Sequence, residues 1–160
     1  MNTIIPLNVQ INIPQALDFY NRLEKEFIEQ KWVGTGDVVG SENKTDGVYG
    51  WGLQTTKNDI SEPYHLYENP FEFDYTQYKR TVNCVDWCNK VLDTFPTAYR
   101  STLVVSPPGT WVRPHTDNDQ NIRIHIPIIT DPRCVWFVDN KEFHMEAGKA
   151  YVVILGQTHG

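Results

Sequence analysis

The sequence has little of what marks several large classes of protein. Its 160 residues include only three cysteines and 14 lysines and arginines, and no apolar run approaches the roughly 18 residues of a membrane-spanning helix. An odd and small cysteine count does not form the disulfide framework of a secreted domain. The basic residues are scattered and the formal net charge is −6, so no basic surface for nucleic acid is indicated. We therefore expect neither a membrane nor a nucleic acid as partner.

The beginning of the chain, MNTIIPLNVQINIP, lacks the basic segment and the long apolar run of a signal peptide. We therefore expect a cytoplasmic protein. Cys84 and Cys88 are four residues apart, which puts them on one face if the stretch is helical. Two thiols without a nearby Cys or His pair are a weak zinc signal, so packing as small apolar residues is the favoured interpretation.

Length and composition suit one domain over 1–160 with a sizeable core, since 40% of the residues are hydrophobic. Residues 1–95 are predicted to contain helices and loops. Apolar residues recur with a helical period from Pro14 over PQALDFYNRLEKEFIEQ, and a second helix is expected over Tyr75–Thr94, before Pro96. Loops with one or two strands are expected between them, and Val48–Leu53 is a strand candidate.

Residues 99–160 read as a series of short strands that would form the core of the domain. Their close, regular spacing is typical of a sandwich, a jelly roll or a barrel. The expected fold class is therefore mainly β with flanking helices. The predicted strands are Thr102–Ser106, Trp111–His115, Ile122–Ile129, Cys134–Val138, Glu142–Met145 and Tyr151–Leu155, with a tight turn at Asp139-Asn140-Lys141.

Chemistry-bearing residues occur as a His-x-Asp pair, His115 and Asp117, and a distant histidine, His159. Side chains two apart on an extended chain point the same way, so the pair can present a nitrogen and an oxygen to one ion. Two histidines and one carboxylate form the facial triad of non-haem Fe(II) oxygenases. A His-x-Asp pair alone arises by chance in many surface loops, and Asp119 is an alternative carboxylate ligand that fits the spacing less well.

Glycines frame both parts of this set. Gly109 precedes His115, whereas Gly148 and Gly156 precede His159 in a Gly-x-x-His pattern. This frame matches the two-part signature of cupins, except that Ile154 stands where proline is usual. Two separated matches carry more weight than the His-x-Asp pair alone.

The stretch NIRIHIPI alternates, with isoleucines on one side and Arg123 and His125 on the other. We expect the isoleucines to pack into the core, and Arg123 and His125 to face the same interior as the metal ligands. An inward arginine needs an anion, which either a protein carboxylate or, preferably, a dicarboxylate cosubstrate would supply. His125 is expected to bind that cosubstrate or to orient the site, whereas His65 and His144 are expected to be packed or exposed histidines.

From about Ser101 to Gly160 the sequence resembles the aspartyl/asparaginyl beta-hydroxylase family of Fe(II)- and 2-oxoglutarate-dependent oxygenases. The resemblance rests on PPGTWVRPHTD, on Arg123–His125, on Glu146–Lys149 and on His159. It implies a double-stranded β-helix (a cupin-like jelly roll) and a dioxygenase that hydroxylates a C–H bond of an amino-acid side chain. The substrate would be a protein, a peptide or a free amino acid, and the coproducts succinate and CO2.

The resemblance also implies residue roles. Fe(II) would be bound by His115, Asp117 and His159, and the cosubstrate 2-oxoglutarate by Arg123 and His125. Two features depart from the family pattern. The sequence given stops at Gly160, before the final strand on which the family usually carries an arginine; a truncated chain, substitution by Arg123 or Arg113, and a barrel closed in another way all remain open. Val104, with Ser106 nearby, occupies a position where serine is common.

Two alternatives remain open on the residues themselves. A cupin-type metalloenzyme that does not use 2-oxoglutarate fits the same glycine frame and would pair Arg123 with an internal carboxylate. A non-catalytic β-sandwich binding module would instead bind its ligand through aromatic loop residues. Those residues are Trp51, Tyr64, Tyr67, Phe71 and Tyr75.

Overall fold

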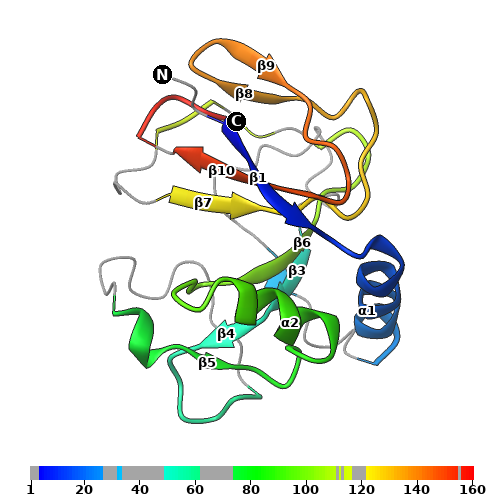
Figure 1. The fold of residues 1–160 in the computed structure, drawn as a ribbon, viewed down its shortest axis with the longest axis vertical. Helices are drawn as coiled ribbons and strands as arrows, with labels where there is room; N and C mark the ends of the chain where they lie inside the picture. The colour runs from blue at the N-terminus through cyan, green and yellow to red at the C-terminus, as the bar shows by residue number, and fades with distance from the viewer. Residues whose placement is uncertain are drawn as a thin grey trace. The chain divides into compact units, whose positions relative to one another are not determined.

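The computed structural model shows a mainly β protein whose chain divides into two compact units (Figure 1). The first unit comprises Met1–Leu17 and Trp111–Gly160, and the second comprises Asp18–Thr110. No helix among the described residues is long and apolar enough to span a membrane. The structure describes residues 4–26, 32–33, 49–61, 74–110, 112, 114–116, 122–154 and 156–160.

The first unit is built on an antiparallel sheet in which β10 (Lys149–Ile154) lies between β1 (Ile4–Gln10) and β7 (Ile122–His125) (Figure 1). Strand β1 was not predicted, because Pro6 interrupts its apolar pattern. Proline cannot donate to a ladder, but it is tolerated on an edge strand, which is the position of β1 in this sheet.

A hairpin of β8 (Trp136–Val138) and β9 (Lys141–Phe143) confirms the predicted turn between two strands. The turn residues Asp139 and Asn140 have φ values of 51° and 59°. Two successive left-handed residues are the geometry of a type I′ turn, whose twist matches that of the flanking strands and which favours Asp and Asn.

The core of the first unit lies between the sheet and the hairpin. Ile4, Tyr151 and Val153 from the sheet form one buried cluster with Val138 and Met145, and Trp136 and Phe143 pack against it. Alternate residues of a strand share a face, so each layer contributes one face to this cluster. The sheet and the hairpin therefore face each other across an apolar interior.

The orientation of β7 was predicted half correctly. Arg123 pairs with Val153 and His125 with Tyr151, and directly paired residues share a face, so Arg123 and His125 lie on the core face as predicted. The prediction that the isoleucines pack into the core is wrong, because they occupy the opposite face, where 61% of Ile122 is exposed. Alternation shows which residues share a face but does not say which face is covered.

Strand β7 is also shorter than predicted. It ends at His125 because Pro127 has no amide hydrogen to continue the ladder. The carbonyl of Pro127 instead accepts a hydrogen bond from the Gly148 amide, at 3.0 Å. Beyond it, Ile129 is 70% exposed.

Helix α1 (Ile13–Glu26) confirms the helix predicted from Pro14, and the division between the two units falls within it. Asn12 caps its first turn, since the Asn12 side-chain oxygen accepts from the Gln15 amide at 3.1 Å. In the second unit, Phe19 of this helix is buried and packs on Trp87, with ring centroids 5.6 Å apart.

The sheets of the second unit are small. Trp51 and Leu53 are buried and belong to the core of this unit. The predicted strands at Val48–Leu53 and Thr102–Ser106 are confirmed, and the structure shows that they pair with each other. One sheet has β3 (Tyr49–Gly52) between β2 (Trp32–Val33) and β6 (Thr102–Val105), and a second pairs β4 (Gln54–Thr55) with β5 (Lys79–Arg80).

The predicted helix over Tyr75–Thr94 is wrong in its first half. That half holds a 3-10 turn, η2 (Tyr75–Gln77), and then β5, and only α2 (Trp87–Thr94) is α-helical. Side chains compete with helical hydrogen bonds here, because Thr81 and Asn83 both donate to the carbonyl of Gly52, at 2.8 and 3.1 Å.

The prediction of a single domain over 1–160, with its core in 99–160, stays a prediction. The structure assigns β6 to the second unit and β1 to the first. Several predicted features lie outside the described residues. They are Trp111 and Arg113 of one strand, Asp119, Leu155, and the aromatic residues Tyr64, Tyr67 and Phe71.

We expect Gly50→Ala to destabilise the second unit. A Cβ atom at Gly50 in β3 would overlap the backbone carbonyl of Leu103, which can move only if the β3–β6 pairing shifts. Urea unfolding should show a loss of about 1–3 kcal/mol. Gly156→Ala is the matched control, with nothing within 4 Å of its Cβ and an expected change within about 0.5 kcal/mol. Equal stability of the two variants would contradict this account of Gly50.

Candidate functional site

His115 and His159 are joined through their backbones in the first unit. Each amide donates to the other residue's carbonyl, both at 2.8 Å, and His159 is also bridged to Val138 of β8. Residues 158–160 therefore lie between the segment around His115 and the hairpin, in an antiparallel arrangement. Because directly paired residues share a face, both histidines point to the same side as Val138, which belongs to the buried cluster.

The two imidazole rings lie side by side, with centroids 4.4 Å apart and planes inclined at 53°. His159 is 2% exposed, and His115 is half-buried. Nδ1 of His159 lies 2.8 Å from the backbone carbonyl oxygen of Gln157, and a carbonyl can only accept, so Nδ1 carries the proton. In the neutral ring Nε2 then holds the lone pair, which is the tautomer that a metal ligand needs.

Asp117, the third predicted ligand, lies outside the described residues. Among the residues that are described, no group of three His, Cys, Asp or Glu side chains could hold a metal ion. The structure thus brings together two of the three predicted ligands. The role of Asp117 stays a prediction from its spacing to His115.

His125 lies on the core face of β7. Its ring packs edge-on against Trp136, with ring centroids 4.3 Å apart. Its Nε2 atom is buried and makes no hydrogen bond to any described residue. Burial, followed by the charges of Arg123 and His159, lowers the pKa of His125 to about 3. The ring is therefore neutral at physiological pH.

Arg123 lies two residues before His125 and faces the same side of β7. Its side chain is more exposed than predicted, so this guanidinium retains part of its hydration. Its position still brings a fixed positive charge to the face that carries His125, and that charge contributes to the low pKa of His125.

The two remaining histidines are His144 and His65, and the structure describes only the first. His144 is exposed and hydrogen-bonds through Nδ1 to the carbonyl of Cys134 at 3.0 Å, as expected of a histidine outside the site. His65 lies outside the described residues.

Two contributors to the site were missed from the sequence, namely Trp136 and the Gln157 carbonyl. Trp136 could have been found, because it is two residues from the buried Val138 and so shares its face. The backbone acceptor at Gln157 leaves no signal in residue identity.

Comparison with protein families gives a match to the aspartyl/asparaginyl beta-hydroxylase family over residues 63–159, more than half of the chain. The chain belongs to this family. The matched range includes every predicted site residue, from His115 to His159. Comparison with curated proteins and with solved structures found no match. The protein is therefore a member of a hydroxylase family, with two adjacent histidines and an Arg-x-His strand in its first unit.

The neutral His125 predicts acid sensitivity of this family member. Unfolded histidine has a pKa near 6.5 and folded His125 one of about 3, so below pH 6.5 the unfolded state binds a proton that the folded state does not. Stability therefore falls as pH falls, by about 2 kcal/mol at pH 5 from this residue. Denaturant unfolding of the metal-free protein should show this component, and His125→Gln should lack it.

His144→Gln is the matched control, because His144 is exposed. Its stability should follow that of the unsubstituted protein across the same pH range. A parallel pH dependence in His125→Gln would show that His125 is not the group responsible.

Proposed function

We propose that the protein is an Fe(II)- and 2-oxoglutarate-dependent dioxygenase that hydroxylates a C–H bond of an amino-acid side chain. The observation that carries the proposal is the pair of adjacent imidazoles at His115 and His159, with the His159 ring fixed by the Gln157 carbonyl. A ring that a hydrogen bond from Nδ1 fixes in one orientation and one tautomer is typical of metal-binding histidines.

The donor set fits ferrous iron. Two imidazole nitrogens from His115 and His159 and one carboxylate oxygen from Asp117 would occupy one face of the ion and leave the other positions open. Bound Fe(II) would supply the chemistry that couples oxidative decarboxylation of 2-oxoglutarate, to succinate and CO2, with oxidation of a C–H bond. The chain's own contribution is to hold its ligands still and to exclude water.

Arg123 and His125 are proposed to bind 2-oxoglutarate. The cosubstrate is a dianion, and the Arg123 guanidinium on the interior face of β7 would offset part of its charge. His125 is neutral, and its buried Nε2 makes no hydrogen bond to the described residues, so with the proton on Nε2 the ring would donate to a carboxylate oxygen of the cosubstrate. Trp136 would fix the orientation of that ring.

The proposed fold is a double-stranded β-helix, the cupin-like jelly roll. The support is that the β1-β10-β7 sheet and the β8-β9 hairpin enclose one apolar cluster, and that the histidines face this interior. Such a scaffold holds ligands on strands rather than on loops, and strands fix side-chain positions more tightly.

The substrate class follows from the family rather than from the described residues. We propose an amino-acid side chain, in a protein, a peptide or a free amino acid. A small cosubstrate and an amino-acid substrate are then the partners of the site, and the protein would act as a single oxygenase domain.

We expect His115→Ala and His159→Ala each to weaken Fe(II) binding by roughly 100-fold or more, because each removes one direct ligand. Anaerobic Fe(II) titration measures the binding. Succinate formation from 2-oxoglutarate should be lost in both variants. His144→Ala, which removes an exposed histidine, should keep both properties. Unchanged iron binding in the first two variants would contradict the proposed metal site.

We expect Arg123→Gln to raise the KM for 2-oxoglutarate more than it lowers kcat, because the proposed contact is to cosubstrate charge. The expected rise is tenfold or larger, and a tenfold rise corresponds to about 1.4 kcal/mol of lost binding free energy. Arg133→Gln is the matched control, since Arg133 is exposed and paired with Asp131 at 2.7 Å. If iron binds but 2-oxoglutarate does not, a metalloenzyme without this cosubstrate is the better assignment.

A further inference from the structure

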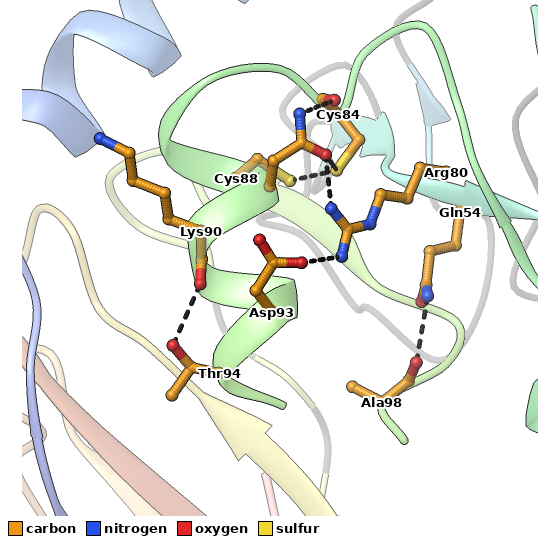
Figure 2. Close-up of polar contacts among 9 residues, drawn as sticks. Gln54, Arg80, Cys84, Cys88, Lys90, Asp93, Thr94 and Ala98 are labelled. Carbon is orange, nitrogen blue, oxygen red and sulfur yellow. Dashed lines mark hydrogen bonds and ion pairs between the residues drawn. The ribbon is translucent and has the colours of Figure 1, made fainter. Parts of the chain in front are cut away.

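Two buried cysteines face each other in the second unit, where the chain enters α2. Cys84 precedes the helix and Cys88 lies in its first turn, and their Sγ atoms are 2.9 Å apart (Figure 2). Both residues are buried. Packing as small apolar residues, the interpretation favoured from the sequence, accounts for the burial but not for a direct contact between two sulfur atoms.

Polar groups hold Cys84 in position. The side-chain amide of Asn89 donates to the backbone carbonyl of Cys84 at 2.9 Å, and its oxygen lies 3.6 Å from Cys84 Sγ. The same oxygen accepts from Arg80 at 2.8 Å, and Arg80 is paired with Asp93 at 2.6 Å (Figure 2). A guanidinium is thereby fixed on the side of the pair that carries Cys84.

The two thiols are electrostatically unequal. The hydrogen bond with Cys88 lowers the pKa of Cys84, and the Arg80 charge lowers it further, while burial and the Asp93 charge raise it. The pKa of Cys88 is raised, first by its hydrogen bond to Cys84 and then by burial. The pair thus consists of one sulfur with a lowered pKa beside the Arg80 guanidinium and one with a raised pKa, and this inequality suits an attacking and a resolving cysteine.

We propose that Cys84 and Cys88 form a reversible dithiol–disulfide pair that is oxidised by hydrogen peroxide, with Cys84 as the attacking sulfur. The two cysteines belong to the second unit and the proposed iron ligands to the first, and the inference does not depend on the proposed function. A metal site is not favoured, because no third His, Cys, Asp or Glu of the described residues joins the two thiols.

The reaction balances as two steps. The Cys84 thiolate attacks one peroxide oxygen, the O–O bond breaks, and hydroxide leaves and takes up a proton as water, which gives a sulfenic acid at Cys84. The Cys88 thiol then attacks the Cys84 sulfur, the S–O bond breaks, and a second water forms with the proton of Cys88. Two thiols are oxidised to one disulfide and one peroxide is reduced to two waters.

Burial decides which oxidant can act. Both side chains are nearly inaccessible to solvent, so a small neutral oxidant reaches them where a peptide disulfide does not. The contact between the sulfurs makes the second step intramolecular, which favours disulfide formation over further oxidation of the sulfenic acid.

The experiment uses the full chain carrying Cys134→Ser, because Cys134 is exposed and would react independently. The metal-free protein, with chelator present, is treated with hydrogen peroxide, unfolded, alkylated and analysed by peptide mass spectrometry. We expect loss of both alkylations from the peptide that carries Cys84 and Cys88, and their full recovery after dithiothreitol. Full alkylation of both, under peroxide that oxidises Cys134 in the unsubstituted protein, would overturn the proposal.

The roles of the two sulfurs are separated by single variants in the same background. After peroxide treatment, Cys88→Ser should hold a sulfenic acid at Cys84 that a dimedone probe, present while the protein is unfolded, labels, whereas Cys84→Ser should leave Cys88 with several-fold less label. Circular dichroism and thermal melting check that both variants fold. Equal labelling of the two would refute Cys84 as the attacking sulfur, and the disulfide test above does not require either variant.

Discussion

The pair of backbone hydrogen bonds between His115 and His159 is the constraint on which the site depends. It joins segments that are far apart in the sequence and fixes both residues in one register. A shift by one residue would turn one imidazole to the opposite face, because side chains alternate along extended chain. The bridge from His159 to Val138 ties this pair to the hairpin and so to the apolar interior. The backbone pairing, rather than contact between the rings, therefore sets the positions of the two imidazoles.

Much of the site could be predicted from the sequence, because its residues follow short-range rules. The spacing of His115 and Asp117 and the alternation around Arg123 and His125 are local patterns, and the structure bears out the shared interior face of Arg123 and His125. The hairpin at Asp139 and Asn140 could also be predicted, because a turn with left-handed backbone conformations favours those residue types.

The predictions that were wrong concern segments in which contacts between distant parts of the chain override the local sequence pattern. The isoleucines of β7 alternate as a core strand should, but the layer that covers the sheet lies on the other face. In the second unit, Thr81 and Asn83 bond to Gly52, and this long-range contact replaces a helix that the apolar period had predicted. The acceptor that sets the His159 tautomer is a backbone carbonyl, which no residue identity reveals.

The ladder between β1 and β10 has a consequence for how the protein is made. It pairs residue 4 with residue 153, and Ile4 belongs to the buried cluster of the first unit. During synthesis β1 leaves the ribosome long before its partner strand β10, which lies more than a hundred residues later in the chain. Its apolar side chains must stay unpaired in the nascent chain over that interval, and such edges are prone to aggregation. Closing so long a loop also costs entropy before any contact compensates for it, so assembly of the first unit is expected to be a late and slow event.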